Sequence, residues 1–110
     1  MSRRVWRVEE KLAAFQDYIA ITRHVEDWTD DRALADRTVE AIRSFVKSLA
    51  EVPHRGTRRD DLRPGLRIVP FKKHTAIAFE IDETAGVVTI LRVFYGGQDY
   101  ETIMRATIRQ

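Results

Sequence analysis

The first half of the chain places its apolar side chains three and four positions apart, which is the spacing of an amphipathic helix. This spacing starts at Glu9, after a weakly alternating run over residues 3–8 that predicts a short strand at or next to a sheet edge. The apolar stripe of the first helix is formed by Leu12, Phe15, Ile19 and Thr22 and is widened by Tyr18, Ile21, Val25 and Trp28. A stripe of this kind indicates a helix that packs against a sheet or a second helix.

Polar residues between Trp28 and Asp31 interrupt the helical spacing, which begins again after them. Thr29 or Asp30 is suited to cap a second helix, and the aspartates suit the positive end of its dipole. One apolar face of this helix is formed by Leu34, Thr38, Ala41, Ile42, Phe45, Val46 and Leu49. Pro53 ends the helix, and two helices with so short a connection predict an antiparallel hairpin.

The second half of the chain changes to the two-residue alternation of strands. Three strands are predicted, over Leu66–Phe71, Thr75–Asp82 and Val87–Tyr95, separated by polar or glycine-containing turns. Val87–Tyr95 is the most apolar run, so we expect it centrally in the sheet. Asp99 is suited to cap a short last helix. The apolar residues of that helix are Ile103, Met104 and Ile108.

The predicted order is therefore strand, helix, helix and three strands, followed by a short C-terminal helix. This order indicates an α+β fold (β-α-α-β-β-β) in which an N-terminal short strand and a helical hairpin pack on a small antiparallel sheet. At 110 residues the chain is expected to form one domain over residues 1–110.

The chain contains no cysteine, which excludes disulfides, thiolate chemistry and cysteine-based zinc sites. The scattered histidines His24, His54 and His74 lack the spacing of metal ligands, so neither a metal nor another cofactor is expected. No run approaches the roughly 20 apolar residues that cross a bilayer, and no apolar run follows the N-terminal arginines as in a signal peptide. We expect a soluble cytoplasmic protein without a membrane partner.

The net charge of +2 is distributed unevenly along the chain. Residues 53–110 carry ten Lys or Arg against seven Asp or Glu, and most of this excess lies between residues 55 and 73. Such clustering indicates a surface that binds an anion or an acidic partner, although a solvated loop and strand face has the same composition. The candidate cations are Arg58, Arg59, Arg63, Arg67, Lys72 and Lys73. Asp60 and Asp61 are suited to organising the neighbouring arginines.

Arg92 stands within the most apolar strand, with apolar residues on both sides. A guanidinium buried there without a partner would be costly, so Arg92 must reach a carboxylate, carbonyl oxygens or solvent. One interpretation is an ion pair with Asp99, Glu80 or a carboxylate of the helical hairpin. The other interpretation adds Arg92 to the cations that bind a target or partner.

Two motifs combine in the second half of the chain. Residues 53–67 read P-x-x-G followed by R-x-D-L-x-P-G-L-R, and residues 90–99 read I-L-R-V-x-x-G-x-x-D. Together with the helical hairpin before them, these motifs resemble the RelE/ParE superfamily of toxins from bacterial type II toxin–antitoxin systems, most closely its ParE branch. The resemblance covers nearly the whole chain, and the fold of that family agrees with the order of elements predicted above.

The resemblance implies a toxin that is neutralised by a cognate antitoxin. ParE-like members act on DNA gyrase by protein–protein contact, whereas RelE-like members cleave mRNA on the ribosome, so the shared scaffold leaves both mechanisms open. A ParD-like antitoxin is expected to wrap a segment over the helical hairpin and sheet. Its expected anchors, which are equally suited to the core, are Tyr18, Trp28, Phe45 and Trp6. Sequence-specific DNA binding by the toxin alone is not expected.

Ribonuclease chemistry requires cations around the scissile phosphate and a group that accepts the 2′-hydroxyl proton. By resemblance to RelE-type enzymes, the candidates are Arg92, Tyr100, Arg67 and Lys73. The segment after the last strand, residues 97–100, has no arginine and adds a carboxylate that would repel a phosphate. The residues therefore speak against catalysis, and the resemblance to the ParE branch implies a non-enzymatic gyrase inhibitor. The alternatives are an mRNA interferase and a toxin that has lost its target.

Overall fold

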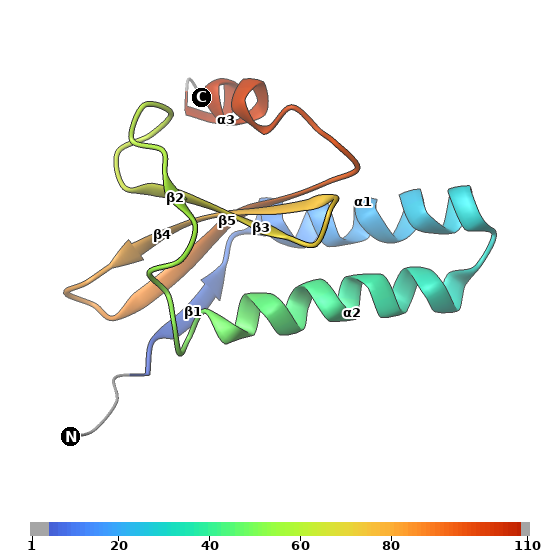
Figure 1. Cartoon of the computed structure of the whole chain (residues 1–110), viewed down its shortest axis with the longest axis horizontal. Coiled ribbons are helices and arrows are strands. Elements are labelled where there is room, and N and C mark those ends of the chain that lie inside the picture. Colours follow the sequence, from blue (N-terminus) through green and yellow to red (C-terminus); the bar gives the residue numbers. More distant parts are fainter. Residues whose placement is uncertain (1–4, 109–110) are drawn as a thin grey trace.

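The computed structural model describes residues 5–108 and confirms the predicted α+β class (Figure 1). Its elements in order are β1 (Arg7–Glu10), α1 (Leu12–Thr29), α2 (Arg32–Ser48), β2 (Thr57–Arg58), β3 (Leu66–Phe71), β4 (Thr75–Asp82), β5 (Val87–Tyr95) and α3 (Tyr100–Ile108). The three long strands have the predicted bounds. The two-residue strand β2 is too short to produce an alternation in the sequence, and it was not predicted.

The five strands form one sheet in the order β1-β5-β4-β3-β2. The pairs from β2 to β5 are antiparallel, as expected, while β1 runs parallel to β5, with Arg7 opposite Val87 and Glu10 opposite Ile90. The first strand is thus confirmed at a sheet edge, and the sheet is mixed. The strand continues to Glu10 instead of ending at residue 8, so α1 begins at Leu12 and not at Glu9. The apolar strand β5 lies inside the sheet, between β1 and β4.

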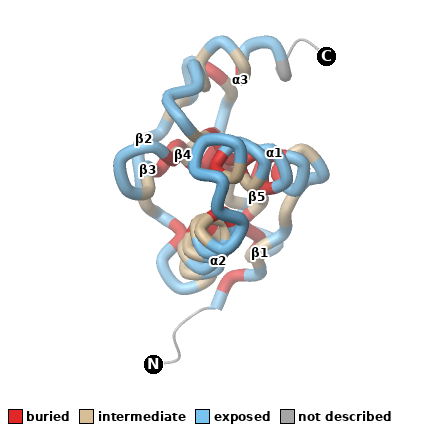
Figure 2. The backbone as a smooth tube through the Cα atoms, turned by 90° about the vertical axis from the view of Figure 1, so that its right-hand side faces the viewer, coloured by how far each residue is buried: buried red, intermediate tan, exposed pale blue. Residues whose placement is uncertain are grey.

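The helical hairpin of α1 and α2 covers one face of the sheet and buries the larger part of the core (Figures 1 and 2). The sheet contributes Ile77, Phe79 and Ile90 to this core, and α2 contributes Ile42 and Val46. The buried residues of α1 are Ala14, Asp17, Tyr18, Ile21 and Val25.

The apolar stripe of α1 is only half buried. Leu12, Phe15 and Ile19 are exposed, with Leu12 exposed to 71%. Because apolar residues occupy more than one side of this helix, the sequence did not determine which side meets the sheet. The side that contains Ala14, Tyr18 and Ile21 does so. The other side of α1 is left as an apolar surface.

The connection between the two helices corrects the predicted cap by one residue. Asp31, rather than Thr29 or Asp30, is the N-cap of α2, because its side chain accepts a hydrogen bond of 3.0 Å from the Leu34 N–H. Asp30 instead ends α1. It has a left-handed φ of 53°, and its N–H donates to the Glu26 carbonyl oxygen over 2.7 Å.

The opposite face of the sheet is covered as well. There, α3 and residues 59–65 enclose a second core, and Figure 2 shows α3 and α2 on opposite sides of the sheet. The buried members of this core are Leu62, Leu66, Ile68, Ala78, Leu91, Phe94 and Met104. Asp99 caps α3 as predicted, since its carboxylate accepts from the Thr102 N–H over 3.2 Å and from the Thr102 hydroxyl over 2.7 Å. The side chain of Ile108 lies outside the described residues.

The structure explains why the P-x-x-G motif ends in glycine. Gly56 has a φ of +75°, and a Cβ at this position would lie 2.3 Å from the Ile68 carbonyl oxygen. The chain passes this close to β3 only without a side chain, and β2 begins at the next residue, Thr57.

Candidate functional site

Arg92 is held by a carboxylate of the helical hairpin. Its Nε and Nη2 atoms donate to the two carboxylate oxygens of Asp17 on α1, each over 2.8 Å. These hydrogen bonds raise the pKa of Arg92. Of the two interpretations of Arg92, the contacts fit the ion pair, with Asp17 as the partner instead of Asp99 or Glu80.

The same carboxylate also completes the edge of the sheet. The strand β1 pairs with β5 only as far as Ile90, and Leu91 is an extra residue in the register between β5 and β4. Beyond β1, the Val93 N–H of β5 donates to Asp17 Oδ2 over 2.7 Å. Asp17 therefore binds both a backbone N–H and a guanidinium of β5, just beyond the point where β1 stops pairing with β5.

The arginines of residues 58–63 also face carboxylates. Ion pairs join Arg58 to Asp60 over 3.2 Å, Arg59 to Asp61 over 2.8 Å and Arg63 to Glu80 over 3.6 Å. Hydrogen bonds from Arg59 lower the pKa of Asp61 to about 2. The Asp60 carboxylate accepts from the Gly65 N–H over 2.8 Å, and this bond lowers its pKa. The two aspartates thus organise the segment between β2 and β3.

Arg59 additionally connects this segment to α3. Its Nη1 donates to Glu101 over 3.0 Å and to the Tyr100 hydroxyl over 3.4 Å. The Tyr100 ring packs against the Phe94 ring, with 5.9 Å between the ring centroids. Tyr100 is therefore part of the contact that holds α3 on the sheet.

Of the four candidates for ribonuclease chemistry, Lys73 and Tyr100 come together. They line one cavity of about 160 Å³, which His74 and Gln98 also line. Arg92 and Arg67 do not line it: Arg92 binds Asp17, and Arg67 Nη1 lies 3.4 Å from the Arg55 carbonyl oxygen. Neither of these two arginines therefore lines the cavity that contains Tyr100.

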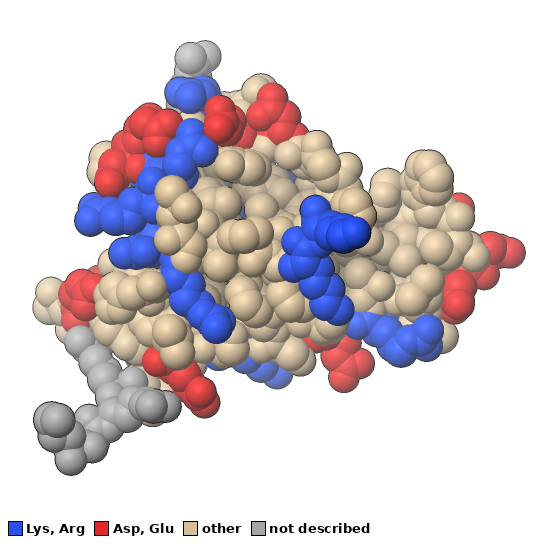
Figure 3. Space-filling view, in the orientation of Figure 1, with Lys and Arg blue, Asp and Glu red and all other residues tan. Residues whose placement is uncertain are grey.

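A second cavity separates the turn between β3 and β4 from helix α2. We call this cavity of about 330 Å³ the turn slot. Its apolar and hydroxyl-bearing lining is formed by Leu34, Thr38, Ala41, Ile42, Phe71, Thr75 and Tyr95. Its basic and titratable lining is formed by Arg37, Lys72, Lys73 and His74. Lys and Arg side chains gather at the centre of the face in Figure 3, over the region where Figure 1 shows this turn beside α2.

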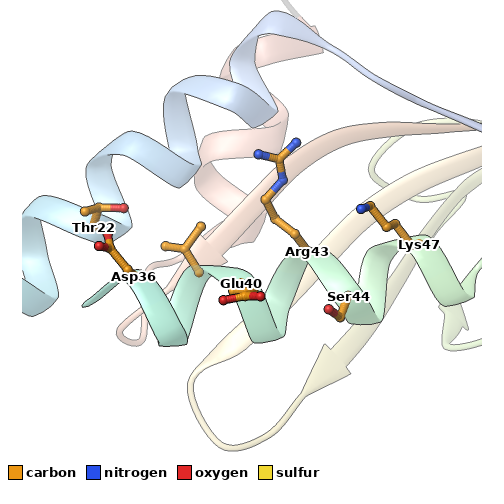
Figure 4. A pocket seen from close by; sticks show the side chains of 7 residues that line it. Thr22, Asp36, Glu40, Arg43, Ser44 and Lys47 are labelled. Atoms are coloured by element: carbon orange, nitrogen blue, oxygen red, sulfur yellow. The ribbon is translucent and has the colours of Figure 1, made fainter. Parts of the chain in front are cut away.

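A third cavity, of about 450 Å³, runs along the outside of the helical hairpin, and we call it the hairpin groove (Figure 4). It is lined by Thr22 of α1 and by Asp36, Val39, Glu40, Arg43, Ser44 and Lys47 of α2. Arg43 covers the rings of Phe15 and Tyr18, with its guanidinium carbon 5.6 Å and 4.9 Å from their centroids. The groove therefore carries charges of both signs beside the exposed stripe of α1.

The four predicted anchor residues have different surroundings. Trp6 and Tyr18 are buried, and Phe45 is half-buried and stacks on Phe71 with 4.7 Å between ring centroids. Trp28 is 79% exposed at the end of α1. Exposed apolar surface on the hairpin therefore comes from Trp28 and from the unburied stripe of α1.

Within residues 5–108, no helix has the length and apolar character needed to cross a membrane. In the same part of the chain, no three His, Asp or Glu side chains are grouped so that they could hold a metal ion.

The sequence from residue 8 to residue 100 matches the family model described as the ParE toxin of the type II toxin–antitoxin system, parDE. The chain belongs to the ParE toxin family. This match includes all five strands except the first residue of β1, and it includes both helices of the hairpin. The resemblance seen in the motifs is thereby confirmed for the ParE branch.

Solved structures of related toxins share the fold of this ParE-family protein. The chromosomal ParDE system from P. aeruginosa matches with a TM-score of 0.71 at 22% identity, covering 84% of this chain and 97% of that chain. The toxin–antitoxin complex RelBE2 from Mycobacterium tuberculosis matches with a TM-score of 0.62 at 19% identity, covering 84% and 99%. A mutant of the E. coli toxin RelE in the free state matches with a TM-score of 0.62 at 10% identity, covering 96% and 99%. No curated protein matches the sequence.

Proposed function

We propose that this ParE-family toxin inhibits DNA gyrase by protein–protein contact and is neutralised by a cognate ParD-like antitoxin. The observation that carries the proposal is the match to the ParE family over residues 8–100. The proposal requires the protein to act in the cytoplasm, where gyrase and its DNA lie. It requires neither a metal nor another cofactor.

The surroundings of the arginines support a non-enzymatic mechanism. A ribonuclease would need cations that are free to stabilise charge on the scissile phosphate. Here Arg92 is bound by Asp17, and Arg59 is bound by Asp61 and Glu101. Cations already neutralised by carboxylates contribute little to stabilising a phosphate.

The second candidate function is that of a RelE-like ribosome-dependent mRNA interferase. The specific observation in its favour is the shared cavity of Lys73 and Tyr100. In that case Tyr100 would act on the 2′-hydroxyl proton and Lys73 would stabilise the phosphate charge.

The exposed side of α1 supports an antitoxin partner. Leu12, Phe15 and Ile19 recur with helical spacing and remain exposed, and Trp28 extends the apolar surface at the end of the helix. An amphipathic helix of the antitoxin would bury this stripe while it lies along the hairpin groove. Large apolar anchors of this kind supply most of the binding energy of an interface.

The experiment that tests the proposal measures gyrase supercoiling beside ribosome-bound mRNA cleavage with the same purified toxin. We expect supercoiling to be inhibited, or cleaved DNA to accumulate, while mRNA stays intact. Adding the ParD-like antitoxin should restore supercoiling. Cut mRNA with unaffected supercoiling would instead support the interferase.

The matched variant for the second candidate is Tyr100→Phe, which removes the hydroxyl and keeps the ring that packs on Phe94. Arg92→Ala is unsuitable for this purpose, because removing the partner of Asp17 weakens the fold itself. If neither activity appears and expression without antitoxin leaves growth unaffected, the protein is a toxin that has lost its target.

A further inference from the structure

The turn slot and the hairpin groove lie along α2 but share no lining residue. Leu34, Thr38 and Ala41 face the slot, and Asp36, Glu40 and Arg43 face the groove. On a helix with 3.6 residues per turn, these two sets occupy different flanks. A partner in one cavity therefore leaves the residues of the other available.

The charges of the two cavities differ. The hairpin groove contains Asp36 and Glu40 next to Arg43 and Lys47. All eleven residues that line the turn slot belong to the described part of the chain, and none of them is Asp or Glu. The slot therefore presents charge of one sign around its mouth, which favours an acidic partner.

The interior of the slot is apolar. Aliphatic surface comes from Leu34 and Ile42 of α2. Aromatic surface comes from Phe71 of β3 and Tyr95 of β5. A volume of about 330 Å³ lies at the lower end of the range for pockets that bind small ligands. An apolar interior with a cationic rim fits one large apolar side chain that has carboxylates close to it on the same segment.

The backbone of the turn supports a functional role for this rim. Lys72 has a left-handed φ of 56°, a conformation that non-glycine residues adopt uncommonly. Its Nζ lies 5.4 Å from the centroid of the Phe71 ring, at the edge of the slot. Strained residues of this kind are concentrated at functional sites.

We propose that the turn slot is the surface through which the toxin contacts its target. Its occupant is an acidic linear segment of the target with one large apolar side chain, which enters between α2 and the turn of β3 and β4. Carboxylates of that segment pair with Arg37, Lys72 and Lys73. The proposal rests on the proposed function, since the target is gyrase. The apolar stripe of α1 is then left for the antitoxin.

The test uses charge reversal in the slot with a matched control. The double variant Arg37→Glu and Lys73→Glu reverses two exposed rim cations. The control variant Arg23→Glu and Arg105→Glu makes the same change of net charge at exposed positions that line neither cavity. Both variants are first compared with the wild type by circular dichroism and thermal unfolding.

The readout is the toxin concentration that gives half-maximal inhibition of supercoiling by purified DNA gyrase. We expect this concentration to rise by at least about tenfold for the slot variant and by less than about twofold for the control. A third variant, Ala41→Phe, fills the slot without changing charge and should weaken inhibition as well. It separates occupation of the slot from a general effect of charge.

Three outcomes would overturn the proposal. If the wild type does not inhibit gyrase, the proposed function fails and the slot loses its target with it. If the wild type inhibits and the slot variants inhibit equally, only the slot assignment fails. If the slot variants inhibit normally but no longer co-purify with the ParD-like antitoxin, the slot belongs to the antitoxin.

Discussion

The sequence assigns Lys73 to a cationic surface, and one of the two interpretations of Arg92 adds it to the same surface, but the surroundings of the two residues are opposite. Arg92 makes two hydrogen bonds of 2.8 Å with Asp17, and only a fifth of its side chain is exposed. Lys73 is exposed, and no carboxylate within the described residues lies within 4.0 Å of it. A count of positive residues therefore does not define a binding surface. Only the cations without a carboxylate partner remain available for another molecule.

The largest expected effect comes from breaking the buried pair. Arg92→Ala should lower the free energy of unfolding by about 2–4 kcal/mol, because it leaves the Asp17 carboxylate buried with only the Val93 N–H as a partner. The loss should be somewhat smaller than for a fully buried pair, since Arg92 is partly exposed. Urea denaturation followed by tryptophan fluorescence measures this change.

The matched control is Arg23→Ala, an exposed arginine on the same helix as Asp17. It should change the free energy of unfolding by no more than about 0.5 kcal/mol. A double-mutant cycle with Asp17→Ala should show coupling between residues 17 and 92. Equal losses for Arg92→Ala and Arg23→Ala would contradict a structural role for Arg92.

The sequence was sufficient for most of the fold because its elements are strongly patterned. The strands β3, β4 and β5 have the predicted bounds, and Asp99 caps the last helix. In α1 the apolar residues surround much of the helix, so periodicity alone could not separate the buried Tyr18 from the exposed Phe15. Which side is buried is decided by tertiary packing against the sheet and α2.

The candidate site was less predictable because it depends on contacts between distant residues. The sequence identified Arg92 as a residue in need of a partner, but Asp17 lies 75 positions away. Arg37 was missed as a slot residue. Its place on one flank of α2 follows from helical spacing, but its proximity to the turn of β3 and β4 follows only from tertiary packing.

The second prediction concerns the paired arginines of the segment between β2 and β3. Arg59→Ala should return the pKa of Asp61 from about 2 toward its ordinary value of 3.8, because hydrogen bonds from Arg59 are the main cause of the shift. NMR titration of the Asp61 carboxyl measures this change. Lys73→Ala is the control and should leave that pKa where it is.

The pH dependence of this pair has a defined sign. The pKa of Asp61 is lower in the folded protein than in the unfolded chain, so the pair stabilises the fold above about pH 4. This contribution should decline as the pH falls from about 4 to about 2, and it should be absent in Arg59→Ala. An unchanged Asp61 titration in the variant would mean that Arg59 does not hold the carboxylate in solution.

The third prediction concerns the strained cation of the turn slot. Lys72→Gly should increase the free energy of unfolding by up to about 1 kcal/mol, because glycine adopts the φ of 56° without steric cost. Thermal and urea denaturation measure the gain. The same variant should inhibit gyrase less well, since it also removes a charge at the rim. Lower stability of Lys72→Gly would show that the lysine side chain contributes packing on Phe71 that outweighs the strain.

The smallest expected effect on stability is that of Lys73→Ala. Without an ion pair within the described residues, Lys73 should contribute no more than about 0.5 kcal/mol to the free energy of unfolding. Its loss should nevertheless weaken gyrase inhibition, and the loss of inhibition should shrink at higher salt because exposed charges are screened. Urea denaturation and supercoiling assays at two salt concentrations measure both effects. Removing a cation that stabilises the fold should thus change the denaturation curve, whereas removing a cation that binds the target should change the supercoiling assay.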